Sequence, residues 1–227
     1  MGNLFSLDSP IVKLLTRIAD IWILNFIFIV TSLPVVTIGA SVTALHYMSM
    51  KMAKGQEGYI IRGYLKSFKQ NFKQSTIIYL IMLVIGAILV GDIYFWLNLN
   101  NTIGTVMGTL STVMALVYFI ELIYVFALQA TFDNPVKRTV KNAFLIALQR
   151  FPITLLLGIF IVVIVYFCVE FIVVDAFMLV YGFGLAAMGT AVFYNWAFKK
   201  YMEEEGTSEC GEQDEEQEGD KQECNNE

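Results

Sequence analysis

Long apolar stretches alternate with short polar segments along most of this chain. Most of the stretches exceed about 18 residues with almost no charge, which is typical of helices that cross a lipid bilayer. The pattern predicts helices at about 18–33, 35–50, 75–97, 105–128, 151–173 and 176–198, with a tight turn near Asp175. The predicted fold class is therefore all-α, a polytopic membrane helix bundle, in a single transmembrane domain over residues 1–202.

The first apolar run, 18–50, contains a break at Pro34, Thr37 and Gly39. One straight helix of this length would measure about 50 Å, whereas the hydrocarbon core of a bilayer is about 30 Å thick. Pro34 disfavours helix at the residue before it, and we interpret Gly39 as a flexible point. The run is therefore predicted to be an N-terminal hairpin, either of two short spans or of a re-entrant kind, followed by four transmembrane helices.

The basic residues predict the topology, because Lys and Arg concentrate in cytoplasmic segments. Both flanks of the first run are basic, so the run must return to the side from which it entered. Continuing the alternation through the four later spans places all fifteen Lys and Arg on the cytoplasmic side. Both termini are then cytoplasmic.

Two of the polar segments carry basic residues beside an apolar stripe at helical spacing. Such a helix suits the membrane interface, so we predict basic amphipathic cytoplasmic helices at 60–73 and 134–150. Their basic stripe, facing lipid or a protein partner, consists of Arg62, Lys66, Lys69, Lys73, Lys137, Arg138 and Lys141.

Composition supports the membrane interpretation, and charge divides the chain in two. The chain is 57% hydrophobic and 15% charged, against about 45–50% and about 25% in soluble domains. Residues 203–227 hold twelve acidic residues and one basic residue, which leaves fourteen basic and eight acidic residues in the body. We expect a disordered acidic cytoplasmic tail at 203–227, and a basic body that contacts anionic inner-leaflet lipids rather than nucleic acid.

Polar residues inside apolar runs are candidates for function, because they are costly in lipid. Asn25, His46 and Glu121 fall at similar depths in the inner half of the membrane. We hypothesise that they form an inner polar cluster. It would serve either as an interhelical hydrogen-bonded contact or as a proton or substrate site.

A second set of charged residues lies near the outer ends of three predicted spans. Asp92, Glu170 and Asp175 have no outer Lys or Arg with which to pair. This outer acidic cluster would attract a cation or hydrogen-bond sugar hydroxyls, or its members are separate end charges that point to water.

No sequence pattern indicates a reaction. The chain has one histidine and lacks a metal-ligand motif, a nucleophile elbow and a phosphate-binding loop, which argues against His-based triads and multi-His metal sites. We expect no enzyme activity, no cofactor and no metal.

Three ordered motifs carry a resemblance to a known family. LPVVTIGASVTAL, GYIIRGYLKSFKQNFKQS and FDNPVKRTVKNAFLIAL resemble the YesL family of bacterial membrane proteins, as do the leading LFSLDSPI and the dipeptide at Leu24–Asn25. The resemblance covers residues 3–200 and excludes the acidic tail. It implies a domain of unknown function in the bacterial plasma membrane, often encoded beside carbohydrate ABC-transporter and sugar-sensing genes of Gram-positive bacteria.

The resemblance and the basic stripe lead to one expected function and one alternative. We expect a membrane protein accessory to carbohydrate (oligosaccharide) uptake or sensing, which docks on subunits of a sugar ABC permease or sensor. The alternative is a small-molecule transporter in its own right, which the broken hairpin and the inner polar cluster favour. A transporter needs a polar route through the membrane, and the four long spans hold few strong polar residues.

Overall fold

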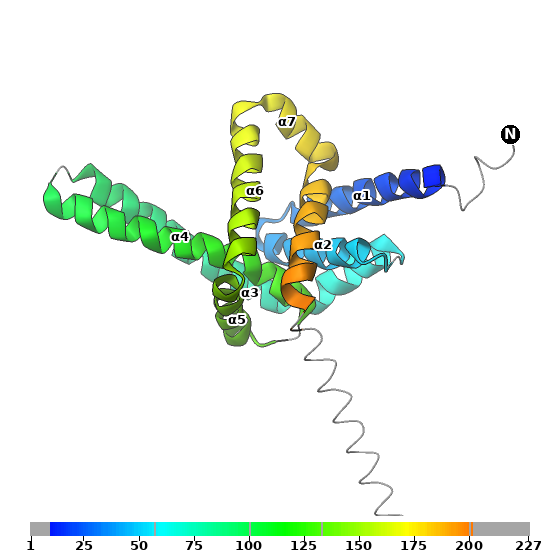
Figure 1. Cartoon of the computed structure of the whole chain (residues 1–227), viewed down its shortest axis with the longest axis horizontal. Helices are drawn as coiled ribbons and strands as arrows, with labels where there is room; N and C mark the ends of the chain where they lie inside the picture. The colour runs from blue at the N-terminus through cyan, green and yellow to red at the C-terminus, as the bar shows by residue number, and fades with distance from the viewer. Residues whose placement is uncertain (1–9, 57, 100, 133, 200, 202–227) are drawn as a thin grey trace, which may run out of the picture.

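The computed structural model describes residues 10–56, 58–99, 101–132, 134–199 and 201 of the chain, and these form helices and connecting turns without a strand. The elements are α1 (Pro10–Ser32), the 3-10 turn η1 (Val35–Thr37), α2 (Ile38–Ala53), α3 (Ile60–Asn98), α4 (Thr102–Thr131), α5 (Val136–Gln149), α6 (Phe151–Glu170), α7 (Ile172–Phe177) and the π-turn η2 (Met178–Gly182) (Figure 1). The chain continues as helix over residues 183–199, here named the C-terminal helix. The predicted tail at 203–227 lies outside the described residues.

Five helical segments are long and apolar enough to cross a membrane, which confirms the predicted all-α polytopic fold class. They are Val12–Ser32, Ile60–Asn98, Thr102–Thr131, Phe151–Glu170 and Ile172–Lys199. Only 11–33% of the most apolar window of each segment is buried inside the protein, so most of the apolar surface is left for lipid. Helix α2 is not among the five, because its 16 residues reach about 24 Å.

Helices α1 and α2 form the predicted hairpin. At its closed end the Thr37 hydroxyl donates hydrogen bonds to the carbonyls of Thr31 at 2.6 Å and Pro34 at 2.7 Å. At its open end Nη1 of Arg17 donates to the carbonyl of Met52 at 3.1 Å. The basic flanks of the two helices therefore lie at the same end of the hairpin.

The interpretation of Gly39 as a flexible point is wrong. Gly39 is buried in the first turn of α2, where a Cβ atom would stand 2.5 Å from the Ser75 carbonyl oxygen and 2.5 Å from Cβ of Tyr79. The missing side chain lets the backbone of α2 approach α3 closely. The break in the first apolar run is therefore made by Pro34 and η1 alone.

Helix α3 runs for 39 residues without interruption. The basic segment at 60–73 is therefore not a helix of its own, as the sequence interpretation had it, but the first part of α3. The equivalent junction after α5 does break, at Arg150 (φ −108°, ψ 37°), because Pro152 has no N–H to continue the hydrogen-bond ladder. No proline stands at the corresponding point in α3.

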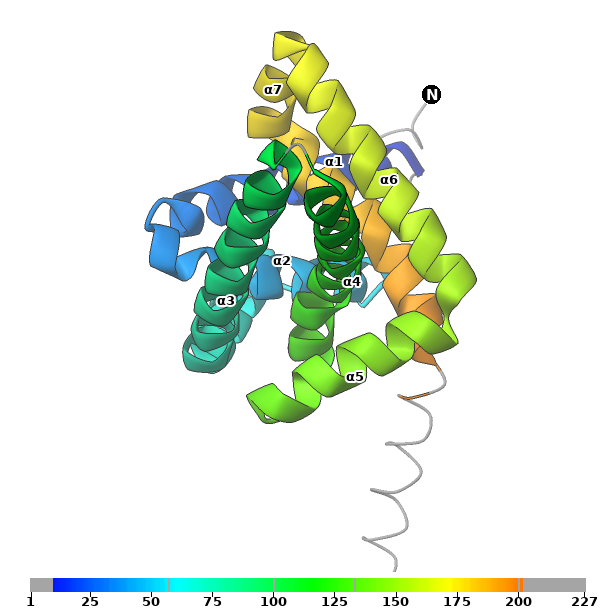
Figure 2. The same ribbon diagram turned by 90° about the vertical axis from the view of Figure 1, so that its left-hand side faces the viewer.

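A second hairpin is formed by α6, which leads up to Phe171, and by α7, η2 and the C-terminal helix, which lead back from it. The predicted turn near Asp175 is displaced, since Phe171 (φ −127°, ψ 104°) makes the break and Asp175 lies within α7. Figures 1 and 2 show that this hairpin and the α3–α4 hairpin project in different directions from a shared base. The helices thus form a splayed assembly rather than a bundle of parallel rods.

The shared base is held together by an aromatic cluster. Tyr124, Tyr194 and Phe198 are almost completely buried, and the rings of Tyr194 and Phe198 stack with centroids 5.8 Å apart. The Tyr194 hydroxyl donates to the carbonyl of Ile123 at 2.7 Å, and the Tyr124 hydroxyl lies 3.0 Å from that of Thr154. These contacts fasten α6 and the C-terminal helix to α4.

Candidate functional site

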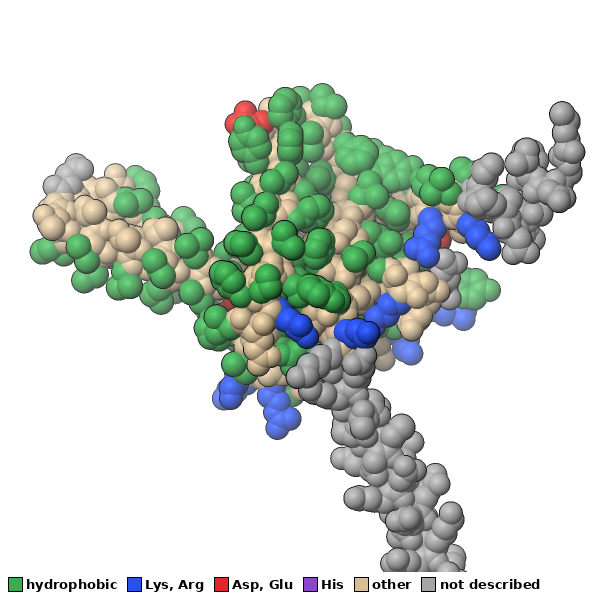
Figure 3. Space-filling view, viewed as in Figure 1, with side chains coloured by type: hydrophobic (Ala, Val, Ile, Leu, Met, Phe, Trp, Pro, Cys, Tyr) green, Lys and Arg blue, Asp and Glu red, His purple; other side chains and the backbone are tan. Residues whose placement is uncertain are grey.

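The exposed basic side chains of α3 and α5 form a surface that we name the basic face. It consists of Arg62, Lys66, Lys69, Lys73, Lys137, Arg138 and Lys141, all of which are exposed. In Figure 3 the blue side chains gather along the lower and right-hand parts of the molecule, away from the tips of the two long hairpins. None of the seven forms an ion pair within the described residues, so their charges are available to a ligand or partner.

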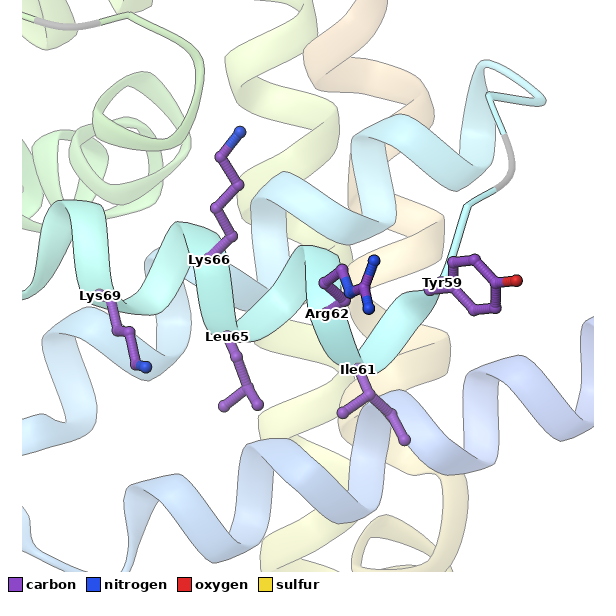
Figure 4. A pocket seen from close by; sticks show the side chains of 6 residues that line it. All are labelled: Tyr59, Ile61, Arg62, Leu65, Lys66 and Lys69. Atoms are coloured by element: carbon purple, nitrogen blue, oxygen red, sulfur yellow. The ribbon is translucent and has the colours of Figure 1, made fainter.

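A groove of about 660 Å³ lies at the start of α3, within the basic face. Its lining comprises Tyr59, Ile61, Arg62, Leu65, Lys66 and Lys69 (Figure 4). The Arg62 guanidinium lies 5.7 Å from the centroid of the Tyr59 ring, a cation–π distance. Cations beside exposed apolar side chains suit an anionic lipid head group or an acidic protein segment.

A buried polar network fixes the two halves of the basic face relative to each other. The Gln129 amide group of α4 donates to Oδ1 of Asn71 at 3.2 Å and to Oε1 of Gln74 at 2.7 Å, both on α3. Its carbonyl oxygen accepts a hydrogen bond from the Thr139 hydroxyl of α5 at 3.2 Å. The sequence analysis missed this network, although a glutamine just beyond a predicted span is a signal that could have pointed to it.

Asn25 of the hypothesised inner polar cluster is completely buried. Its Nδ2 donates to the carbonyl of Leu179 at 2.9 Å, and its Oδ1 accepts from the backbone N–H of Gly184 at 3.1 Å. These two backbone groups lie five residues apart across η2, the separation of a π-helical hydrogen bond. Asn25 thus connects α1 to the π-turn of the second hairpin.

His46 lies on α2 with its ring edge against Tyr194, at 5.3 Å between centroids. Its Nδ1 is buried and has no hydrogen-bond partner among the residues that the structure describes. Glu121 is partly exposed on α4 and makes no hydrogen bond or ion pair within the described residues. No hydrogen bond joins Asn25, His46 and Glu121 to one another, and each has its own surroundings.

The three outer carboxylates lie on two separate hairpins. Asp92 accepts hydrogen bonds from Nε1 of Trp96 at 2.9 Å and from the hydroxyl of Ser111, which joins α3 to α4. Glu170 and Asp175 are exposed near the tip of the second hairpin. Because the two hairpins project in different directions (Figure 1), the structure does not bring the three together.

The described residues contain no group of three or more His, Cys, Asp or Glu side chains placed to hold a metal ion. Two candidate sites remain. The first is the basic face, whose side chains are charged and exposed. The second is the surroundings of His46, whose Nδ1 is buried.

These helices are those of an integral membrane protein with several apolar spans. Residues 21–93, about a third of the chain, match the family model described as "Protein of unknown function, DUF624". The matched stretch covers the closed end of the first hairpin, all of α2 and most of α3. It includes Asn25, His46 and four of the seven residues of the basic face. No curated protein and no solved structure matches the chain.

Proposed function

We propose that the protein is an accessory subunit of oligosaccharide uptake or sensing in the bacterial plasma membrane. It docks on a sugar ABC permease or sensor through the basic face, with both termini in the cytoplasm. The resemblance to the YesL family supports the carbohydrate context, and the match to a family of unknown function is compatible with it.

The observation that carries this proposal is the exposure of the basic face. Seven cations stand on two helices whose relative position is fixed by the Gln129 network. A preorganised set of charges lowers the entropic cost of binding and gives specificity for an acidic surface. Anionic inner-leaflet lipids are the second natural partner of the same charges, at about 1 kcal/mol per basic residue.

Transport by the protein itself is the alternative function. The cavity between its hairpins has walls that are almost entirely apolar, and an oligosaccharide needs many hydrogen-bonding partners along its route. The splayed hairpins and the broken first hairpin are the features that favour transport. A small apolar or amphiphilic solute would suit such a route better than a sugar.

Native co-purification tests the proposal. The protein carries a tag at its N-terminus, is extracted gently from its own membrane after growth on polysaccharide, and its stoichiometric partners are identified by mass spectrometry. We expect permease or sensor subunits with the wild type and with Lys66→Arg/Lys69→Arg. We expect at least a tenfold loss of these subunits with Lys66→Glu/Lys69→Glu.

Recovery of the protein alone, or as a homo-oligomer, would overturn the accessory role. Uptake assays in liposomes would then compare the wild type with Glu121→Ala. Equal recovery of partner subunits with the charge-reversed and charge-conserving variants would remove the basic face as the interface while leaving the accessory role intact.

A further inference from the structure

The described chain leads into its acidic segment, residues 203–227, at a defined point beside α5. Phe198, near the end of the C-terminal helix, is completely buried. The Tyr201 hydroxyl donates a hydrogen bond to Oε1 of Gln149, the last residue of α5. In Figure 2 the end of the C-terminal helix, in orange, lies beside the end of α5. The acidic segment itself lies outside the described residues, but these contacts set the place from which it starts.

The basic face is within reach of this starting point. Its three residues on α5 lie 8 to 12 positions before Gln149, which is about 12–18 Å along the helix. The Gln129 network then joins α5 to α3 next to Lys73, and the cations of α3 continue from there to Arg62 over about 17 Å. An extended chain as long as 203–227 spans up to about 80 Å. The acidic segment is therefore long enough to cover the whole face.

The acidic segment and the basic face carry strong charges of opposite sign. The segment holds twelve acidic residues and one basic residue, a net charge of −11, and the face holds seven cations. Six of the twelve acids fall within residues 212–220. The segment contains no Leu, Ile, Val, Met or aromatic residue, so an apolar surface offers it no anchor. Exposed cations are the part of the molecule that it can bind.

The groove at the start of α3 suits a chain of carboxylates better than one compact anion. Arg62, Lys66 and Lys69 all line it, and the planar guanidinium of an arginine matches a carboxylate group. Figure 4 shows that these three side chains spread outward from α3 in different directions instead of converging on one point. A segment with many separate carboxylates can engage all of them, whereas a single phosphate cannot.

We propose that residues 203–227 bind across the basic face of their own chain. Being tethered beside α5 gives the segment an effective concentration that a separate anionic partner lacks, in the millimolar range for short flexible connections. The proposal concerns the same surface as the proposed docking, but it requires no permease or sensor subunit. A partner that docks on the basic face has to displace the acidic segment.

The distance between two spin labels tests the proposal on the purified full-length chain in an uncharged detergent. One label is attached to Cys210 in the acidic segment and the other to Gln70→Cys, an exposed position among the cations of α3. Cys168 and Cys224 are replaced by serine. We expect a short, narrowly distributed distance at low salt. High salt should abolish it, because the Debye length falls from about 10 Å at 0.1 M to about 3 Å at 1 M.

A label at Asn98→Cys provides the matched control. Asn98 is also exposed, at the far end of α3, and lies about 42 Å along the helix from Gln70. Its distance from Cys210 should be long and broadly distributed at both salt concentrations. This control distinguishes binding to the basic face from general adsorption on the apolar helices.

Charge variants test whether the contact is electrostatic. Lys66→Glu/Lys69→Glu should lower the short-distance population by about fivefold, through the loss of two exposed ion pairs. Lys66→Arg/Lys69→Arg should preserve it. Unfolding midpoints of the two variants check that both are folded, which the exposure of these side chains leads us to expect.

Three outcomes would overturn the proposal. Equal distances at low and high salt, or in the two charge variants, would mean that the basic face does not hold the segment. A short-distance signal that weakens when labelled protein is diluted with unlabelled protein would make a second copy of the chain the occupant. Absence of the short distance, with anionic lipid retained in native mass spectrometry, would make the membrane the occupant. Because the sample contains no permease or sensor subunit, each outcome leaves the accessory role to its own test.

Discussion

Asn25 supplies, from a neighbouring helix, hydrogen bonds that a π-turn would otherwise make internally. Its side-chain amide donates to the Leu179 carbonyl and accepts from the Gly184 N–H. Gly184 permits this approach, because a Cβ there would stand 2.9 Å from the Ile21 carbonyl oxygen. Stability at this point depends on one polar residue rather than on a polar cluster.

Replacing Asn25 by leucine should therefore destabilise the protein. The substitution keeps the volume similar but removes the hydrogen bonds of Asn25 to the Leu179 carbonyl and to the buried Gly184 N–H, at a cost of about 1–3 kcal/mol. The measurement is the midpoint of unfolding in detergent. Asn98→Leu is the control, because Asn98 is exposed and, within the described part of the chain, its side chain bonds only to the Tyr94 carbonyl of its own helix. Equal midpoints for the two variants would contradict the role of Asn25.

The sequence could predict that Asn25 and His46 are unusual, but not what surrounds them. A polar residue in an apolar run is visible as a cost in lipid. The partner of Asn25 is backbone exposed by η2, and nothing in the apolar stretch at 176–198 distinguishes a π-turn from a regular helix. The unpaired Nδ1 of His46 likewise depends on packing from helices distant in sequence.

At the scale of helices, proline and glycine account for the agreements and the errors of the sequence analysis. Pro34 and Pro152 end helices where the pattern predicts ends. The basic segment at 60–73 has no such residue before the next apolar run, and α3 therefore continues. The role of Gly39 could not be predicted, because flexibility and close packing demand the same residue and only the neighbouring helix distinguishes them.

Gly39→Ala should force α2 away from α3. The new Cβ would meet the Ser75 carbonyl, which belongs to the backbone and cannot rotate aside, so we expect a destabilisation of about 1–3 kcal/mol. Gly91→Ala on α3 is the matched control, since a Cβ there meets nothing within 4 Å. This control should be neutral or stabilising by up to about 1 kcal/mol, because alanine favours helix over glycine. Unfolding midpoints of the two variants decide the matter.

Gln129→Leu should loosen the attachment of α5. Asn71, Gln74 and Thr139 each lose their contact with Gln129. We therefore expect amide hydrogen exchange in α5 to be faster than in the wild type, with a smaller change in α6. The comparison is Gln70→Leu, which changes an exposed glutamine of α3. Unchanged exchange in α5 would mean that its apolar contacts alone position this half of the basic face.

At the scale of the whole molecule, the first hairpin lies beside only the first half of α3. Gly39, next to the closed end of the hairpin, contacts Tyr79, and the nineteen residues from there to Asn98 span about 28 Å of helix. The closed end therefore stops well short of the α3–α4 tip. Of the two alternatives for the first apolar run, this arrangement favours the re-entrant hairpin.

Cysteine accessibility tests the depth of the hairpin. We expect Thr37→Cys to resist an impermeant thiol reagent added outside intact cells, and Asn101→Cys at the exposed α3–α4 tip to react. Both variants carry Cys168→Ser to remove the background thiol within the described helices. Reaction of both from the outside would mean that the hairpin crosses the membrane completely.

The contact at Gly39 also has a mechanical consequence. Tyr79 is the middle residue of α3, so this tight contact divides the helix into two arms of equal length, one ending in the basic face and the other at the far tip. An uninterrupted helix pressed against a neighbour at its midpoint can work as a lever with a central fulcrum. A partner that pulls the basic end sideways would then swing the opposite tip by a similar distance in the other direction.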